Sequence, residues 1–188
     1  FLTELGDHAQ ATHHTAEALR IFEWLAEYCE RQYTADHPNT LLILQRLAVS
    51  RRETGDLEGA RELQERVLDV YERTLALDSF ELAAARANLA GTLADLGDLP
   101  GALALEEAAL TIFERSLPAD DPNLLAVRGN LAFHKLELGD VEGALELQRE
   151  IVAALESSVA EAPLQLGWAL VRLGTIQQEM GRIAEAET

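Results

Sequence analysis

The chain repeats itself every 42 residues, and this period constrains its fold more than any other feature. A glycine recurs at that spacing and is followed by Asp three times and by Arg once: Gly55, Gly97, Gly139 and Gly181. An alanine lies five residues after each glycine. A leucine lies eight residues before each glycine, and a small residue follows that leucine directly. Because such a period indicates a repeat architecture, we expect a stack of similar units.

Each copy is predicted to form two helices joined at the Gly-Asp pair. Glycine readily adopts the left-handed conformation that ends a helix, and aspartate caps the free amides that begin the next one. After Gly55 the apolar residues follow the three- and four-residue spacing of an amphipathic helix: Leu57, Ala60, Leu63, Val67, Val70 and Tyr71. Helix pairs are therefore expected at about 1–33, 38–76, 80–117, 122–159 and 163–188.

A single helix pair cannot bury its apolar face, so neighbouring pairs must stack into one continuous core. We therefore predict an all-α fold, an α-solenoid of antiparallel helix pairs whose concave surface is lined by the first helices. The copies form one array over 1–188, of about four and a half repeats: 1–37, 38–79, 80–121, 122–162 and a truncated 163–188. The last copy ends just after its second helix begins, and no polar capping repeat follows, so we expect a fragment of a longer protein.

Charge and composition exclude several kinds of function. The chain carries 15 Lys and Arg against 33 Asp and Glu, a formal net charge of −18, which argues against nucleic-acid binding. No apolar run of 18 or more residues is present, so no membrane-spanning segment is expected. The single cysteine and the lack of a signal peptide fit a cytoplasmic protein.

The repeated residues resemble the tetratricopeptide (TPR) repeat family. The pattern of leucine and a small residue, a glycine seven later and an alanine five after that is the usual TPR pattern. The 42-residue period, segment 37–40 and the repeated Asn-Leu-Ala at 88–90 and 130–132 resemble the kinesin-light-chain type. Arg86 and Arg128 are similar to bacterial versions found in signalling proteins. The resemblance implies a right-handed superhelix that binds a protein or peptide in its groove, without catalysis or a cofactor.

Family geometry points one column of the first helices into this groove: Arg46, Asn88, Asn130 and Arg172. Asparagine side chains donate and accept hydrogen bonds, so they could hold the backbone of an extended peptide. Arginines could pair with acidic groups of the partner. Alternatively, the asparagines cross-link neighbouring helices and the arginines only keep the surface soluble. Phe133 and Trp168 are candidate apolar anchors, whereas Leu42 is expected to pack between copies.

A second column is acidic in four copies: Glu53, Asp95, Glu137 and Glu179. A carboxylate in the last turn of a helix opposes the helix dipole, so its repetition suggests an acidic rim that attracts basic partners. A solvated edge of an already acidic protein, copied by duplication, is the other interpretation and is slightly favoured.

Other reactive side chains are not expected to form sites. His8, His13 and His14 lie close in sequence, but zinc needs three or four convergent ligands, and no cysteine or second histidine cluster accompanies them. We expect no metal and no enzymatic activity. Cys29 falls in the core column of the second helices, His134 is assigned to an outward column with Ser50 and Thr92, and Trp24 is expected on an exposed helix face.

A different function is also consistent with the sequence. The array would then be a sensor or self-assembly segment that regulates an effector domain in a larger signalling protein. Self-association through its uncapped ends is part of this hypothesis.

Overall fold

The structure, a computed structural model, describes residues 3–4, 15–157 and 163–186, and the side chains of the last helix up to residue 181. These residues form eight helices and no strand, which confirms the all-α class. The chain divides into two compact units, Phe1–Asp98 and Leu99–Thr188, described separately below. None of the described helices is both long and apolar enough for a bilayer crossing.

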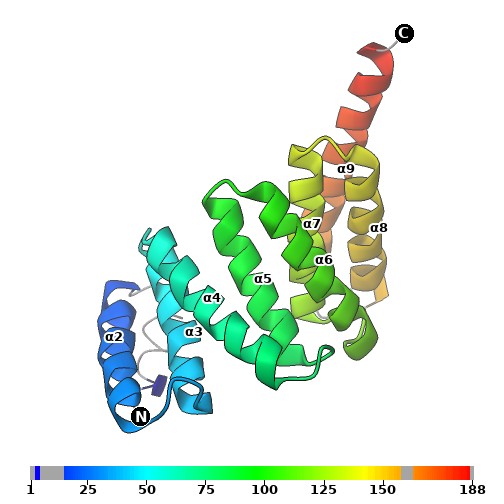
Figure 1. The fold of residues 1–188 in the computed structure, drawn as a ribbon. Coiled ribbons are helices and arrows are strands. Elements are labelled where there is room, and N and C mark those ends of the chain that lie inside the picture. Colours follow the sequence, from blue (N-terminus) through cyan, green and yellow to red (C-terminus); the bar gives the residue numbers. More distant parts are fainter. Residues whose placement is uncertain (1–2, 5–14, 158–162, 187–188) are drawn as a thin grey trace. The chain divides into compact units, whose positions relative to one another are not determined.

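The first unit contains four described helices in which consecutive helices pack side by side (Figure 1): α2 (Thr15–Gln32), α3 (Pro38–Glu53), α4 (Leu57–Thr74) and α5 (Phe80–Asp95). The core joins α2, α3 and α4 around Phe22, Leu44 and Val67. Ala18, Ala48 and Ala60 are fully buried. The small alanine side chain lets neighbouring helix backbones approach closely, so these alanines, which belong to two repeat columns, position the helices.

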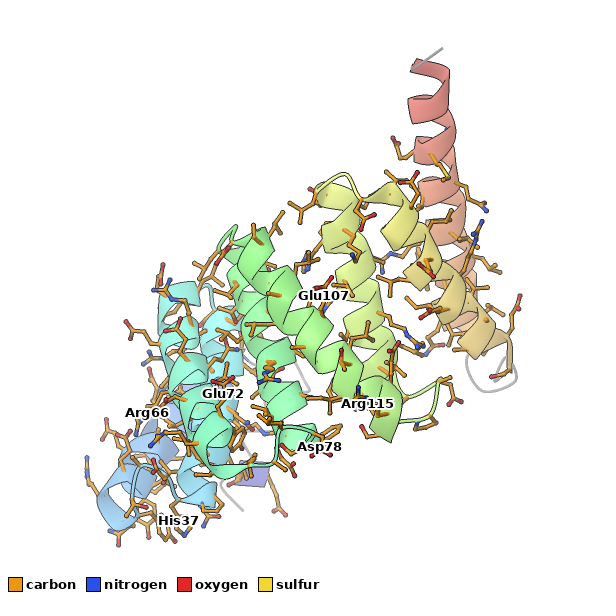
Figure 2. All side chains as sticks on the ribbon, turned by 45° about the vertical axis from the view of Figure 1, so that its right-hand side comes forward. His37, Arg66, Glu72, Asp78, Glu107 and Arg115 are labelled. Carbon is orange, nitrogen blue, oxygen red and sulfur yellow. The ribbon has the colours of Figure 1, made fainter. Side chains whose placement is uncertain are left out.

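Charged side chains join α4 to α2 and to α5. Arg66 Nη1 lies 2.6 Å from Glu30 Oε1 on α2, and Arg86 Nη2 on α5 lies 3.1 Å from Glu72 Oε1. Figure 2 labels Arg66 and Glu72, which project from α4. Arg86, one of the arginines that resemble bacterial versions, is thus engaged within the fold and is mostly buried.

The second unit also has four described helices (Figure 1): α6 (Leu99–Ser116), α7 (Pro122–Glu137), α8 (Val141–Ser157) and α9 (Pro163–Ala186). Leu131, Leu145 and Ile176 are central in one core cluster, and Ile151 and Ala169 belong to a second cluster where α8 meets α9. Arg128 on α7 contacts Glu114 on α6 at 2.9 Å and Glu150 on α8 at 3.1 Å. This arginine is equivalent to Arg86 and again serves the fold.

The predicted helix ends are confirmed at three of the four glycines. Gly55, Gly97 and Gly139 have φ angles of 90°, 87° and 85°, in the left-handed region that favours glycine. The amide of the aspartate after each glycine donates to the carbonyl oxygen five residues before it, at 2.8–2.9 Å. The turn predicted at Gly181 is absent, because α9 continues through it to Ala186. Arg182 follows this glycine instead of a capping aspartate, so no side-chain acceptor is present to begin a new helix there.

Polar side chains are buried where successive helices meet. Gln64 Nε2 on α4 donates to the Asn88 backbone oxygen on α5 at 3.2 Å, and Gln148 Nε2 on α8 donates to the Ala169 oxygen on α9 at 2.9 Å. These hydrogen bonds satisfy the buried amide nitrogen of each glutamine while joining one helix pair to the next.

The outward orientation predicted for Ser50, Thr92 and His134 is wrong. All three are buried, and the Nδ1 atom of His134 contacts Glu106 Oε2 at 2.9 Å. Serine and threonine are small enough to pack between helices. The polar residues of this column therefore face the interior, although their polarity predicted a solvent-exposed face.

Candidate partner-binding surfaces

The predicted groove residues of the first unit are exposed on its first helices. Arg46 lies on α3 and Asn88 on α5. Leu42, which was expected to pack between copies, is exposed instead. The backbone oxygen of Asn88 accepts the hydrogen bond from the buried Gln64 side chain. This contact holds the backbone of Asn88 in place and so positions the exposed Asn88 side chain.

Side chains fill the space below these residues in the first unit. Gln45 Nε2 donates to the Tyr71 hydroxyl at 3.2 Å. Burial and the Glu81 carboxylate raise the pKa of Tyr71, which keeps this hydroxyl protonated. The remaining cavity between α3, α4 and α5 has a volume of only about 10 Å³. At this place between α3, α4 and α5 the first unit therefore offers polar groups and little enclosed space.

The second unit is open at the corresponding place. A pocket of about 490 Å³ lies between α7, α8 and α9, and apolar side chains, including Leu125, Ile151 and Leu155, form much of its wall. Trp168 and Arg172 also line it, and the Trp168 side chain is 71% exposed. Two of the predicted binding residues thus meet at one concave site.

A second pocket adjoins Arg172 on the C-terminal side along α9. It has a volume of about 280 Å³, and its lining includes Phe133, Ile176 and Arg172. Phe133 is 47% exposed, so it presents aromatic surface to solvent. Asn130 is exposed on α7 but lines neither of these two pockets.

Sequence reasoning missed several residues that shape these pockets. Gly129, Leu155 and Gln148 line the open site, yet the first two were indistinguishable from ordinary helix and core positions. One signal was available: the 42-residue column that holds Gly129 has Gln45 and Ala87 in the first unit, so the smallest side chain of the column stands at the open site.

The four residues of the acidic column have different surroundings. Glu53, Asp95 and Glu137 are the last residues of α3, α5 and α7, and all three are exposed. Asp95 Oδ2 lies 2.6 Å from Arg52 Nε, so its charge is partly compensated. Glu179 lies inside α9 and not in a last turn, because the helix continues past it.

The remaining candidate residues have structural surroundings. Cys29 is buried, as expected for the core column, and burial raises the pKa of its thiol. His37 Nδ1 accepts from the Asn39 amide at 3.1 Å, and its ring stacks on Tyr33. Trp24 is exposed and stacks on Tyr28, with ring centroids 5.6 Å apart.

A metal site is not visible in the part of the chain that the structure describes. No group of three histidine, cysteine, aspartate or glutamate side chains converges among those residues. His8, His13 and His14 lie outside them.

Stacked helix pairs with a repeated small-residue core define the class of α-solenoid interaction scaffolds. A family model for the tetratricopeptide repeat matches residues 1–73 and 81–157. The chain therefore belongs to the TPR family, as its repeat pattern suggested. The family's fold generally serves protein–protein interaction and binds protein partners.

Solved structures show the same fold at low sequence identity. A Podosopora anserina kinesin light chain with nearly identical TPR-like repeats aligns at a TM-score of 0.84 and 24% identity, over 99% of this chain and 88% of the other. BtubC (BKLC) from P. vanneervenii aligns at 0.81 and 20%, covering 99% and 74%. The apo form of RapI aligns at 0.74 and 12%, covering 97% and 48%. A search of curated protein sequences gave no match.

Proposed function

We propose that the chain is a non-catalytic scaffold that binds a peptide or protein partner along its first helices, in the concave groove expected of the repeat. The observation that carries this proposal is the meeting of Trp168, Phe133 and Arg172 at two adjoining pockets. Exposed aromatic side chains beside an arginine are the residue types that dominate interface energetics.

Exposed polar side chains support a polar contribution to binding. Asn88 and Asn130 each offer a donor and an acceptor to a partner's backbone, and Arg46 and Arg172 carry positive charge on a strongly acidic protein. In this proposal the acidic residues Glu53, Asp95, Glu137 and Glu179 attract basic parts of the partner from outside the groove.

A lysate capture tests the proposal. The chain with Arg46→Glu and Arg172→Glu is compared with wild type as bait, and captured proteins are identified by mass spectrometry. We expect a partner that wild type retains and the variant loses, because the variant reverses both charges in the groove. Equal capture by both baits would place binding elsewhere on the molecule.

The asparagines need a separate variant. Replacing Asn88 and Asn130 by Ala should weaken binding of that partner roughly tenfold, since each asparagine contributes about one hydrogen bond. Circular dichroism checks that helicity is unchanged. Unaltered affinity would contradict a role for the asparagine side chains.

Exposed apolar residues favour self-association as a second candidate function. Leu164, Trp168 and Val171 on α9 are each more than 60% exposed, and such surface commonly marks interaction sites. In this alternative the chain regulates an effector domain by assembling with further copies. Light scattering over a range of protein concentrations tests it: a constant monomer mass would contradict self-assembly.

A further inference from the structure

The two units contain equivalent sites. The site in the first unit is nearly filled by side chains, and the site in the second unit is open. Four wall positions correspond at a spacing of 84 residues: Gln64 with Gln148, Val67 with Ile151, Ala85 with Ala169, and Asn88 with Arg172. The glutamine in each unit donates to a backbone oxygen of the following first helix. The walls are thus built alike, yet the volumes are about 10 and about 490 Å³.

Three positions that line the open site carry smaller side chains than their counterparts in the first unit: Ala126 for Leu42, Gly129 for Gln45 and Leu155 for Tyr71. Gln45 lines the first site and donates a hydrogen bond to the Tyr71 hydroxyl. Their counterparts in the second unit are Gly129 and Leu155, which are smaller and cannot form that hydrogen bond.

Glycine at 129 is not required by close packing. A Cβ atom built there would lie 3.8 Å from Arg172 Nη1, an ordinary contact distance. Glycine weakens a helix interior relative to alanine, so the packing of α7 gains nothing from it. What glycine does provide is open space between α7 and α9.

Arg172 lies between two apolar pockets. The larger is lined by Gln165, Trp168 and Ala169, before Arg172 on α9, and the smaller by Thr175 and Ile176, after it. No ion pair joins Arg172 to a carboxylate within the described residues. Asp120, which precedes α7, is the acidic residue of the larger pocket and disfavours an anion at that end.

We propose that Gly129 and Leu155 open a specificity site in the second unit for a partner segment with two large apolar side chains and a carboxylate between them. The apolar side chains enter the two pockets, and the carboxylate pairs with the Arg172 guanidinium. This inference rests on the proposed function, because it assumes that the partner is a peptide segment. It adds that the first unit, where Gln45 and Tyr71 fill the site, accepts no such side chain.

Synthetic peptides test the recognition chemistry directly. The probes carry Leu-Asp-Leu or Phe-Asp-Phe cores in Gly-Ser flanks, with and without one glycine on each side of the aspartate. Matched controls replace the aspartate by lysine or the apolar residues by alanine. Affinities come from fluorescence anisotropy with the 188-residue chain.

Two variants change the site in different ways. Gly129→Gln with Leu155→Tyr transfers the filling pair of the first unit, and Arg172→Gln removes the charge without filling a pocket. We expect at least one core to bind wild type and each variant to raise its Kd roughly tenfold or more. Arg149→Gln, an exposed arginine on α8 that lines neither pocket, should leave the Kd unchanged.

Trp168 reports occupancy of the larger pocket. In a Trp24→Phe background it is the sole tryptophan of the chain, and its emission should shift to shorter wavelength when an apolar side chain covers the ring. Absence of that shift on peptide binding would overturn the placement. Binding of the lysine cores as tightly as the aspartate cores, or failure of every core to bind wild type, would overturn the inference as a whole.

Failure of this inference is distinguishable from failure of the proposed function. A partner captured by wild type and equally by the Gly129→Gln, Leu155→Tyr variant contradicts the specificity site and leaves groove binding standing. Circular dichroism melts show whether the Gly129→Gln, Leu155→Tyr variant is as stable as wild type. If the two melts differ, the Arg172→Gln variant, which fills no pocket, separates loss of the site from loss of the fold.

Discussion

A carboxylate occupies position 106, where the equivalent helices carry Gln64 and Gln148, and its side chain is only 1% exposed. Glu106 Oε2 contacts His134 Nδ1 at 2.9 Å, while Oε1 has no hydrogen-bond partner within the described structure. Burial raises the pKa of Glu106, and the contact with His134 opposes this rise only in part. An ionised carboxylate at this position therefore lowers the stability of the fold, whereas a glutamine carries no charge there.

The sign of the pH effect follows from linkage. Because the folded-state pKa of Glu106 is raised above its ordinary value of 4.5, the folded state binds this proton more tightly than the unfolded state. Protonated Glu106 therefore contributes stability below pH 4.5. This contribution is lost as the pH rises through the folded-state pKa, and the free energy of unfolding falls by up to about 1.4 kcal/mol per pH unit. Glu106→Gln should therefore gain stability over wild type as pH rises from about 4 to about 7.

Urea unfolding at several pH values measures this difference. Glu146→Gln on α8 is the matched control, because it removes an exposed carboxylate from the same unit. Parallel stability curves for wild type and Glu106→Gln would show that the buried carboxylate does not titrate as proposed.

The glycine-aspartate turns decide where the elements end. Between α7 and α8, Gly139 has φ of 85°, and Asp140 accepts hydrogen bonds from the Gly143 amide at 2.9 Å and from Lys135 Nζ at 3.0 Å. These two donors lower the pKa of Asp140, the amide being the larger cause. Where the aspartate is missing, at Gly181, the helix continues.

Two glycine substitutions should have opposite effects. Gly139→Ala forces a side chain into the left-handed region and should reduce the free energy of unfolding by about 1 kcal/mol or more. Gly174→Ala lies inside α9, where an added Cβ meets nothing within 4 Å, and should increase it by up to about 1 kcal/mol. Denaturant midpoints check both; a destabilising Gly174→Ala would contradict the open surroundings of that residue.

At the scale of the whole molecule, self-repulsion opposes folding. The formal net charge of −18 is offset only locally by exposed ion pairs such as Arg52 with Asp95, and exposed pairs contribute little stability. The charge imbalance therefore dominates the response to salt.

Raising the ionic strength should stabilise the protein. The Debye length falls from roughly 10 Å at 0.1 M to roughly 3 Å at 1 M salt, so repulsion among carboxylates weakens and the urea midpoint should rise. A variant with Glu53→Gln and Glu137→Gln should show a smaller rise, because it carries two fewer negative charges. A midpoint that falls with salt would mean that the ion pairs outweigh the repulsion.

Much of the fold was determined by the sequence alone, because its signals are local. The 42-residue period, the left-handed glycines and the capping aspartates act over a few residues, so helix bounds near Gly55, Gly97 and Gly139 were predictable. Exposure of Arg46, Asn88, Asn130 and Arg172 was predictable as well, since their place on an amphipathic helix sets the face that they occupy.

Tertiary structure alone decided which buried positions are polar and where space remains. Glu106 meets His134 across two helices, and no spacing within one helix indicates that contact. The pocket at Arg172 exists because Gly129, Leu155 and Trp168 come from three different helices that pack together. A cavity is the volume left over after side chains from separate elements have packed, so it cannot be read from any one of them.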